Sequence, residues 1–261
     1  CLDCGQDEAS GETLLRAVND EHLNVALERL GRRYNVAVNT HRPAVGYKET
    51  IRKPVTQRGR HKKQSGGHGQ FGDVIIEVRP LARGEGFRFE DKITGGAIPR
   101  QWVPAVEMGA RDAMGKGTLG FPVVDVAVTL VDGSFHTVDS SELAFRTAGR
   151  LATSQALAQA NPYLLEPIMH VEIHAPGSAT SKITSAISSH RGQLLGINPR
   201  LNWSRWDVIE ILLPEAELTA LGRELRSMSQ GMATFETRFD HLAEVAAKRA
   251  NEISQRVLET T

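Results

Sequence analysis

The C-terminal third of this sequence alternates short apolar strands with amphipathic helices, and this order restricts the possible folds more than any other feature. Apolar spacing defines, in order, strand 169–173, helix 183–187, strand 194–197, strand 209–213, helix 218–228 and strand 235–239. The order βαββαβ is that of a ferredoxin-like domain, in which two helices cover one face of an antiparallel sheet. We therefore predict an α+β domain here, with a terminal helix in the charged tail from Leu242.

The middle of the chain predicts a second region of mixed strands and helices. Strands are expected at 74–78, 87–91 and 124–130, and helices at 104–113 and 144–156. All five segments are long enough to share a core, so we expect a separate α/β domain.

The connections around this middle domain are polar. Residues 53–72 are basic and glycine-rich, and predict a linker followed by a loop. Asp132–Gly133 is typical of a turn, and 134–141 reads as a polar loop after it. Asp139 stands three residues before Glu142, which is a capping signal for the next helix.

The N-terminal stretch is too short for a complete domain. An amphipathic helix is predicted at 21–33 and a strand at 36–38. We interpret this stretch as part of a domain whose remainder lies upstream.

Composition narrows the class of protein. The chain has 261 residues and a formal net charge of zero, so any attraction to nucleic acid must be local. No apolar run reaches the length of a membrane span, and the first residues lack the features of a signal peptide. We therefore expect a cytoplasmic protein with no membrane contact.

A local attraction of this kind is predicted where a basic run meets a glycine-rich loop. The basic residues are Arg58, Arg60, Lys62 and Lys63, and the glycines are Gly66, Gly67, Gly69 and Gly72. Glycines let a backbone approach closely, and basic side chains meet phosphates, so the segment suits contact with RNA.

Two side chains in the loops have the chemistry for RNA contact. Gln70 carries a donor and an acceptor on one amide, and His136 can donate, accept or stack on a base. The alternative is that both are solvated turn residues, as most loop glutamines and histidines are.

Other site chemistries have weaker support. Cys1 and Cys4 have CxxC spacing, but there is no second cysteine pair to complete a zinc site, so no metal is expected. His136, Asp139 and Ser140 could suggest a hydrolase, yet the chain has no G-x-S-x-G elbow. The glycine loop has no Gly-Lys-Ser/Thr ending, so no nucleotide-phosphate site is expected in this chain.

Five ordered segments together resemble one family of translation proteins. They are Ser65–Gly72 (Ser-Gly-Gly-His-Gly-Gln-Phe-Gly), Thr94–Pro99, Gly120–Asp125, Asp132–Ser141 and Leu165–Ile168. These motifs resemble the C-terminal half of elongation factor G, a translational GTPase, and the resemblance extends from about Asn19 to about Asp240.

The resemblance implies three domains. Residues 1–55 would be part of the third, ferredoxin-like domain, and 56–165 the fourth, an elongated α/β arm with a left-handed crossover. Residues 166–261 would be the ferredoxin-like fifth domain with the C-terminal helix.

The resemblance also implies a mechanical role without catalysis in this chain. GTP and magnesium would be bound by an N-terminal GTPase domain, and this part would bind both ribosomal subunits as a monomer. Loops at the tip of the arm would contact tRNA and mRNA through Gly66, Gly67, His68, Gly69, Gln70, Phe71, His136, Asp139 and Ser140. The basic residues Arg58, Arg60, Lys62 and Lys63 would contact ribosomal RNA phosphates.

Departures from the family pattern leave the exact task open. The family usually has arginine where His68 stands and tyrosine where Phe71 stands. In the region of Ser229–Phe235 the family usually has Gly-Arg-Gly after the glutamine, whereas this chain has Gly-Met-Ala. We therefore expect a divergent paralogue. Translocation is the leading hypothesis. The alternatives on the ribosome are recycling, ribosome protection, or a stress or regulatory role. The alternative from another functional class is a free-standing RNA-binding module.

Overall fold

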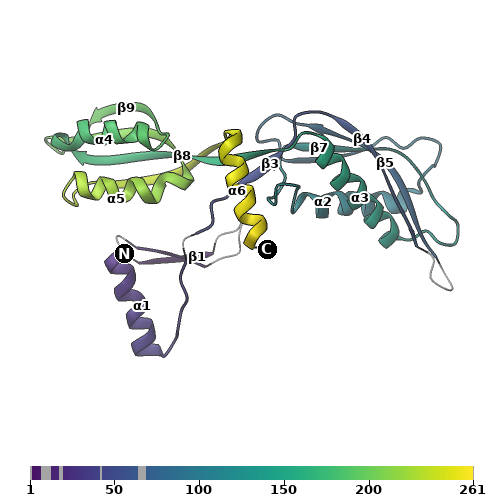
Figure 1. Cartoon of the computed structure of the whole chain (residues 1–261), viewed down its shortest axis with the longest axis horizontal. Helices are drawn as coiled ribbons and strands as arrows, with labels where there is room; N and C mark the ends of the chain where they lie inside the picture. The colour runs from purple at the N-terminus through teal and green to yellow at the C-terminus, as the bar shows by residue number, and fades with distance from the viewer. Residues whose placement is uncertain (1, 7–12, 18–19, 42, 64–68, 261) are drawn as a thin grey trace. The chain divides into compact units, whose positions relative to one another are not determined.

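The structure is a computed structural model that describes residues 1–261 except 1, 7–12, 18–19, 42, 64–68 and 261 (Figure 1). The elements in chain order are β1 (Asp3–Gln6), β2 (Thr13–Arg16), α1 (Asp20–Tyr34), β3 (Lys48–Thr50), β4 (Val55–Lys63), β5 (Gln70–Pro80), β6 (Phe87–Asp91), η1 (Arg100–Trp102), α2 (Val103–Met114), β7 (Val126–Ser134), α3 (Glu142–Gln159), β8 (Tyr163–Pro176), α4 (Gly177–Ser189), β9 (Gln193–Pro199), β10 (Trp206–Pro214), η2 (Glu215–Glu217), α5 (Leu218–Met228), β11 (Thr234–Glu244) and α6 (Ala247–Thr260). The chain divides into two compact units, 1–46 and 47–261. The domain boundaries expected after residues 55 and 165 stay predictions.

The first unit contains the helix predicted at 21–33, which the structure confirms as α1. The strands β1 and β2 pair antiparallel, with Cys4 opposite Leu15. The strand predicted at 36–38 is wrong, because these residues are irregular. The amide of Val36 instead bonds to the carbonyl of Leu30 at 3.4 Å and closes the helix, while Asn35 takes a positive φ of 53°.

The middle sheet has the strand order β4-β5-β7-β6. The pairs β4–β5 and β5–β7 are antiparallel, whereas β6 and β7 are parallel and are joined through α2. The core is formed by one sheet face with α2 and α3, and Phe145 is fully buried in it (Figure 1). Trp102 stacks on Phe145 with ring centroids 5.0 Å apart. The left-handed sense expected for the crossover stays a prediction.

The segment predicted as a linker is wrong for residues 55–63, which form the edge strand β4. Its basic side chains alternate with inward positions, so Arg58, Arg60 and Lys62 are exposed. At the inward position Gly59, a Cβ atom would lie 2.7 Å from the Cβ of Ala152 in α3. The alternating apolar pattern typical of a strand is missing from the sequence, because Gly59 stands at an inward position where an apolar residue would be expected.

The turn predicted at Asp132–Gly133 is also wrong, because β7 continues through both residues to Ser134. Gly133 pairs with Val74, and a Cβ at this position would lie 2.3 Å from the carbonyl oxygen of Asp73. The glycine therefore permits close strand contact within a sheet.

The C-terminal sheet has the order β11-β8-β10-β9, and its neighbouring strands are antiparallel. The first strand of the unit lies between the third and fourth, as in a ferredoxin-like domain. Alternate residues of β8 and β10 share one core with Ile183 and Ile187 of α4 and Leu221 and Leu225 of α5. The predicted ferredoxin-like fold and the terminal helix are confirmed. In addition, β8 pairs with the short strand β3.

No helix in the described part of the chain is long and apolar enough to cross a lipid bilayer.

Candidate nucleic-acid interface

Two loops meet at one end of the middle sheet. One is the approach to β5 at Gly69–Phe71, and the other is the connection from β7 to α3. The amide of Gly69 donates to Oδ1 of Asp139 at 2.9 Å, and the amide of Phe71 donates to the Asp139 carbonyl at 2.8 Å. The hydroxyl of Ser140 donates to the Phe71 carbonyl at 2.9 Å. These contacts hold the two loops together as one surface.

Asp139 is the residue that joins the loops, and the capping role predicted for it is wrong. The N-cap of α3 is Ser141, whose Oγ accepts a hydrogen bond from the amide of Ala144 at 3.2 Å. Gly69 approaches the Asp139 carboxyl so closely that a Cβ atom would lie 3.0 Å from its Cγ. A side chain at Gly69 would therefore require the Asp139 carboxyl to shift by a few tenths of an ångström.

His136 lies on the surface of this loop pair, and its side chain is 54% exposed. Its Nδ1 accepts from the amides of Val138 at 3.3 Å and Asp139 at 3.2 Å, which leaves the ring hydrogen on Nε2. Oδ2 of Asp139 is 3.3 Å from the same Nδ1, so a protonated ring would form an ion pair there. The ring lies 6.4 Å from that of Phe71, between centroids.

Gln70 is held by His61, which the sequence analysis did not predict as a site residue. Its Oε1 is 2.8 Å from Nε2 of His61, a contact in which the amide oxygen accepts. The Gln70 amide nitrogen keeps its two hydrogens for other partners. A period of two along β4 is the signal that would have placed His61 on the same side as Gln57 and Gly59.

The four predicted phosphate contacts differ in what they touch. Arg58 forms two hydrogen bonds to Asp73, at 2.8 and 2.6 Å, and this carboxyl is 2% exposed. Arg60 lies over the ring of Phe71, 5.5 Å from its centroid. Lys62 and Lys63 are exposed at the end of β4.

The electrostatics of Asp73 follow from these contacts. The hydrogen bond from Arg58, aided by one from the Ser134 hydroxyl at 2.8 Å, lowers the pKa of the Asp73 carboxyl against the opposing effect of burial. Arg58 is therefore a structural partner of the sheet as well as a surface cation.

The geometry does not support a hydrolase. The Ser140 hydroxyl donates to a backbone carbonyl and accepts from the His136 amide at 2.9 Å, so the imidazole does not activate it. What the surface offers is exposed positive charge, hydrogen-bond donors and aromatic rings, which are the groups that meet RNA. Gly66, Gly67 and His68 lie outside the described residues, as does Cys1; Cys4 is exposed in β1.

Comparison with known proteins gives a consistent result. The family model of elongation factor G, domain IV, matches residues 43–161, and that of the elongation factor G C-terminus matches residues 163–253. An elongation factor G-like protein of Synechocystis sp. (strain ATCC 27184 / PCC 6803 / Kazusa) is 49% identical over 245 residues, which are 94% of this chain and 37% of the relative. Elongation factor G of Aquifex pyrophilus is 44% identical over 248 residues, which are 95% of this chain and 35% of the relative.

A solved structure agrees with the sequence relatives. A crystal structure of a protein from Thermus thermophilus matches with a TM-score of 0.88 and 37% identity, covering 99% of this chain and 38% of that one. The chain therefore spans little more than a third of the length of the proteins that it matches.

Proposed function

This chain belongs to the elongation factor G family, and from that premise we propose that it is the ribosome-binding part of a GTPase that promotes tRNA–mRNA translocation. GTP and magnesium bind in a separate domain of the full-length protein, which works in the cytoplasm as a monomer. Its partners are both ribosomal subunits, tRNA and mRNA.

The observation that carries this proposal is that hydrogen bonds join two loops into one surface at an end of the middle sheet. Asp139 and Ser140 tie the β7–α3 loop to Phe71 and Gly69 at the start of β5. An end that is held by hydrogen bonds and backed by a packed sheet resists deformation. When this end of the domain occupies the space that a tRNA has left, it favours the states of the ribosome in which the tRNA has moved.

Individual residues take distinct roles at this end. His136 offers its Nε2 hydrogen and a ring face to a base or ribose, and Gln70 offers its amide hydrogens. Arg60, Lys62 and Lys63 supply phosphate contacts, with Arg58 contributing from within its pair with Asp73.

The test uses the full-length parent protein on purified ribosomes, following one round of tRNA–mRNA movement. The substitutions His136→Ala and Gln70→Ala each remove a contact made during tRNA movement. We expect each to slow movement about tenfold, because losing one charged or well-placed hydrogen bond in the transition state has an effect of this size. Ribosome-stimulated GTP hydrolysis should stay near the wild-type rate.

Val138→Ala is the matched control, because Val138 is an exposed neighbour in the same loop with 61% exposure. Movement in this variant should stay close to wild type. Equal loss of movement and GTP hydrolysis in the His136 and Gln70 variants would show that these residues serve the whole protein and not the tip.

A second candidate is the splitting of ribosomal subunits together with a recycling factor. The departures from the family pattern at His68, Phe71 and Ser229–Phe235 motivate it. Subunit splitting followed in parallel decides between the two. Splitting without movement would assign this chain to recycling.

The candidate from another class is a free-standing RNA-binding module. It would bind structured RNA away from the ribosome, with an affinity that falls steeply with salt because Arg60, Lys62 and Lys63 release counterions. Unchanged affinity after reversal of these three charges would remove this candidate.

A further inference from the structure

The chain passes from the middle domain to the C-terminal sheet through a very short connection that ends at Tyr163. Helix α3 ends at Gln159 and β8 begins at Tyr163, so the connection is residues 160–162. Asn161 has a positive φ of 54°, and the next residue is a proline. A few connecting residues between two packed parts are where a hinge can bend. The contacts of Tyr163 therefore decide how firmly this connection is held.

The ring of Tyr163 is held by two arginines. The guanidinium carbon of Arg52 lies 4.0 Å from the ring centroid, and that of Arg83 lies 6.0 Å from it. Nη2 of Arg83 also donates a hydrogen bond to the tyrosine hydroxyl at 3.0 Å. A planar guanidinium at such a separation is attracted to an aromatic ring. The ring is thus restrained both at its face and at its hydroxyl.

Arg83 is anchored in the middle domain. It lies between β5 and β6, and its Nη1 donates to Oδ2 of Asp125 at 2.9 Å. Asp125 is 2% exposed, and its Oδ1 accepts from the amides of Gly84 and Gly86, both at 3.0 Å. Asp125 therefore holds the turn that carries Arg83 as well as the guanidinium itself. The hydroxyl of Tyr163 is bound to a side chain whose position is set by the middle domain.

Arg52 contacts both parts at once. Its backbone amide donates to the carbonyl of Ala160, the C-cap of α3, at 3.0 Å. Its Nη2 donates to Oε1 of Glu244 at 2.5 Å, and Glu244 ends β11 opposite Leu165 of β8. Arg52 therefore spans from the end of a middle-domain helix to the C-terminal sheet.

These contacts suit the fixing of an angle better than the stabilisation of a fold. The side chains of Arg52 and Glu244 are 48% and 49% exposed, and exposed ion pairs contribute little to the free energy of unfolding. Neither arginine nor Tyr163 belongs to the core of the middle domain or to that of the C-terminal sheet. The orientation of the two parts can therefore change while both cores stay intact.

A small change of angle at this connection is magnified at the loop pair. Strand β5 runs from Gln70 at the loop pair to Pro80, close in the chain to Arg83, and its 11 residues span about 33 Å. A rotation of about 5° at the connection therefore moves the loop pair by about 3 Å, and a misplacement of about 1 Å is already costly for a positioned contact.

We propose that Tyr163 is a positioning residue, which fixes the direction of the middle domain relative to the C-terminal sheet through Arg83 on one side and Arg52 on the other. Loss of the ring lets residues 160–162 bend, so the loop pair samples a range of positions. The inference rests on the proposed function for its consequence, which is slower tRNA–mRNA movement.

The test measures distances between two spin labels in the 261-residue chain by pulsed electron spin resonance. The labels are attached at Met108→Cys in α2 and Ser188→Cys in α4, both exposed, after Cys1 and Cys4 are replaced by serine. We expect a narrow distribution of distances in the chain with Tyr163. Tyr163→Ala should broaden the distribution, because the connection is then free to bend.

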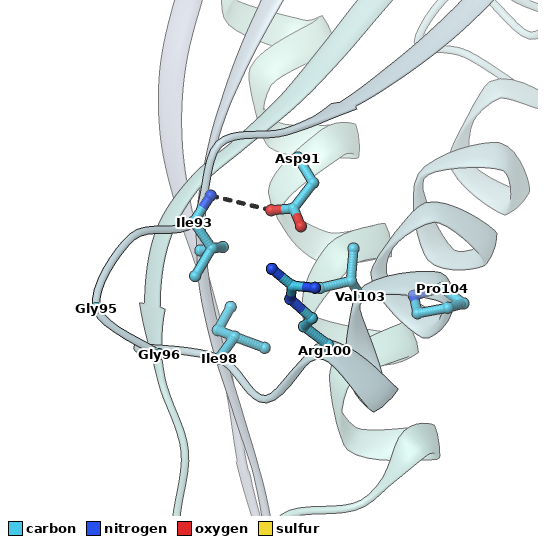
Figure 2. A pocket seen from close by; sticks show the side chains of 8 residues that line it. All are labelled: Asp91, Ile93, Gly95, Gly96, Ile98, Arg100, Val103 and Pro104. Atoms are coloured by element: carbon cyan, nitrogen blue, oxygen red, sulfur yellow. Dashed lines mark hydrogen bonds between the residues drawn. The ribbon is translucent and has the colours of Figure 1, made fainter.

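Three further variants separate the contacts. Tyr163→Phe keeps the ring between the arginines and loses only the hydroxyl, so it should broaden the distribution less than Tyr163→Ala. Arg83→Gln removes the anchor in the middle domain and should broaden the distribution without changing either core. Arg100→Gln is the control, because Arg100 is another exposed arginine of the middle domain and lines a pocket formed by residues 91–104 (Figure 2). Its distribution should match that of the unsubstituted labelled chain.

The consequence for function is measured in the full-length parent protein on purified ribosomes. Tyr163→Ala should slow tRNA–mRNA movement several-fold, and Tyr163→Phe should restore most of the rate. Ribosome-stimulated GTP hydrolysis should stay near the wild-type rate in both variants, which a general loss of folding would not allow.

Failure of this inference is separable from failure of the proposed function. An equally narrow distribution in Tyr163→Ala and Arg83→Gln overturns the positioning role, whatever His136→Ala does to movement. A broadened distribution with normal movement in Tyr163→Ala also overturns it, if His136→Ala slows movement. If the distribution broadens and neither Tyr163→Ala nor His136→Ala slows movement, Tyr163 sets the orientation and the translocation role fails.

Discussion

The carboxyl of Asp73 pairs with Arg58, the first basic side chain of β4. Asp73 lies 2% exposed in β5 and binds Arg58 through both oxygens. A buried carboxylate needs such a partner, because an unpaired charge in the interior is costly. Arg58 is thereby held against the sheet, and the remaining positive charge of the strand lies at Arg60, Lys62 and Lys63.

The same pair predicts how stability depends on pH. Because Arg58 lowers the folded-state pKa of Asp73, the carboxylate stabilises the fold above the unfolded value of about 3.9. This contribution is lost as the pH falls through the folded-state pKa. We expect Asp73→Asn to be less stable than wild type at pH 7, and the difference to close as the pH falls well below 4. Urea unfolding at a series of pH values measures it.

Arg58→Gln provides the companion test, since it removes the partner and leaves the carboxyl in place. Its stability should lose the same pH dependence and fall further at pH 7, because the buried carboxylate then lacks a cation. A gap between wild type and Asp73→Asn that is constant from pH 7 to pH 3 would refute the assigned cause.

Single residues also show where sequence reasoning succeeds. The loops that carry Gln70 and His136 could be predicted from glycine content and motif order, and the structure brings them together. The partners of these residues could not. Asp139 and Ser141 are both good capping residues, and only the contact of Asp139 with Gly69, 70 positions away, decides which one caps α3.

At the scale of elements, α2 and α3 pack so closely that glycines form their interface. A Cβ on Gly109 of α2 would lie 2.0 Å from the Arg146 carbonyl oxygen, and one on Gly149 of α3 would lie 2.7 Å from that of Val106. Both obstacles are backbone atoms, which cannot move without shifting a helix. This pair of helices backs the sheet that carries the two loops.

Gly109→Ala should therefore separate the helices and lower the free energy of unfolding by about 1–3 kcal/mol, the usual cost of overpacking a core. Gly115→Ala is the control at the C-cap of the same helix, where the nearest atom to a new Cβ would be 3.4 Å away. Guanidinium unfolding compares the two. Equal stability of both variants would mean that the helices yield to the added methyl group.

The elements differ in how well the sequence predicted them. The ferredoxin-like unit was predictable because its strands and helices keep clear periods of two and 3.6 residues. The strand β4 was not, since its inward positions include Gln57, Gly59 and His61 and no apolar run remains. Tertiary packing against α3, through the close contact of Gly59 and Ala152, decides that this segment is a strand.

At the scale of the whole molecule, Glu49 connects the two sheets of the second unit. The strand β3 pairs with β8 of the C-terminal sheet, while the carboxylate of Glu49 accepts from the amides of Leu119 at 3.0 Å and Phe121 at 2.9 Å. Those amides belong to the connection between α2 and β7 of the middle domain. Glu49 is 1% exposed, and burial raises the pKa of its carboxyl against the opposing backbone hydrogen bonds.

Removing the carboxylate from this connection should divide one unfolding transition into two. Glu49→Ala leaves two part-buried amides without this acceptor, at a cost of up to about 1–3 kcal/mol each. It keeps the backbone hydrogen bonds of residue 49 to Pro122 and Val124, so it weakens the link between the sheets without removing it. Glu49→Gln keeps one oxygen for both amides and no charge, so it should retain a single transition. The tryptophans allow each part to be followed separately, because Trp102 reports on the middle domain and Trp203 with Trp206 on the C-terminal one. Fluorescence of Trp102→Phe and of Trp203→Phe/Trp206→Phe backgrounds should give coincident midpoints in wild type and separated midpoints in Glu49→Ala. Coincident midpoints in Glu49→Ala would show that the backbone contacts of β3, with β8 on one side and with Pro122 and Val124 on the other, couple the sheets without the carboxylate.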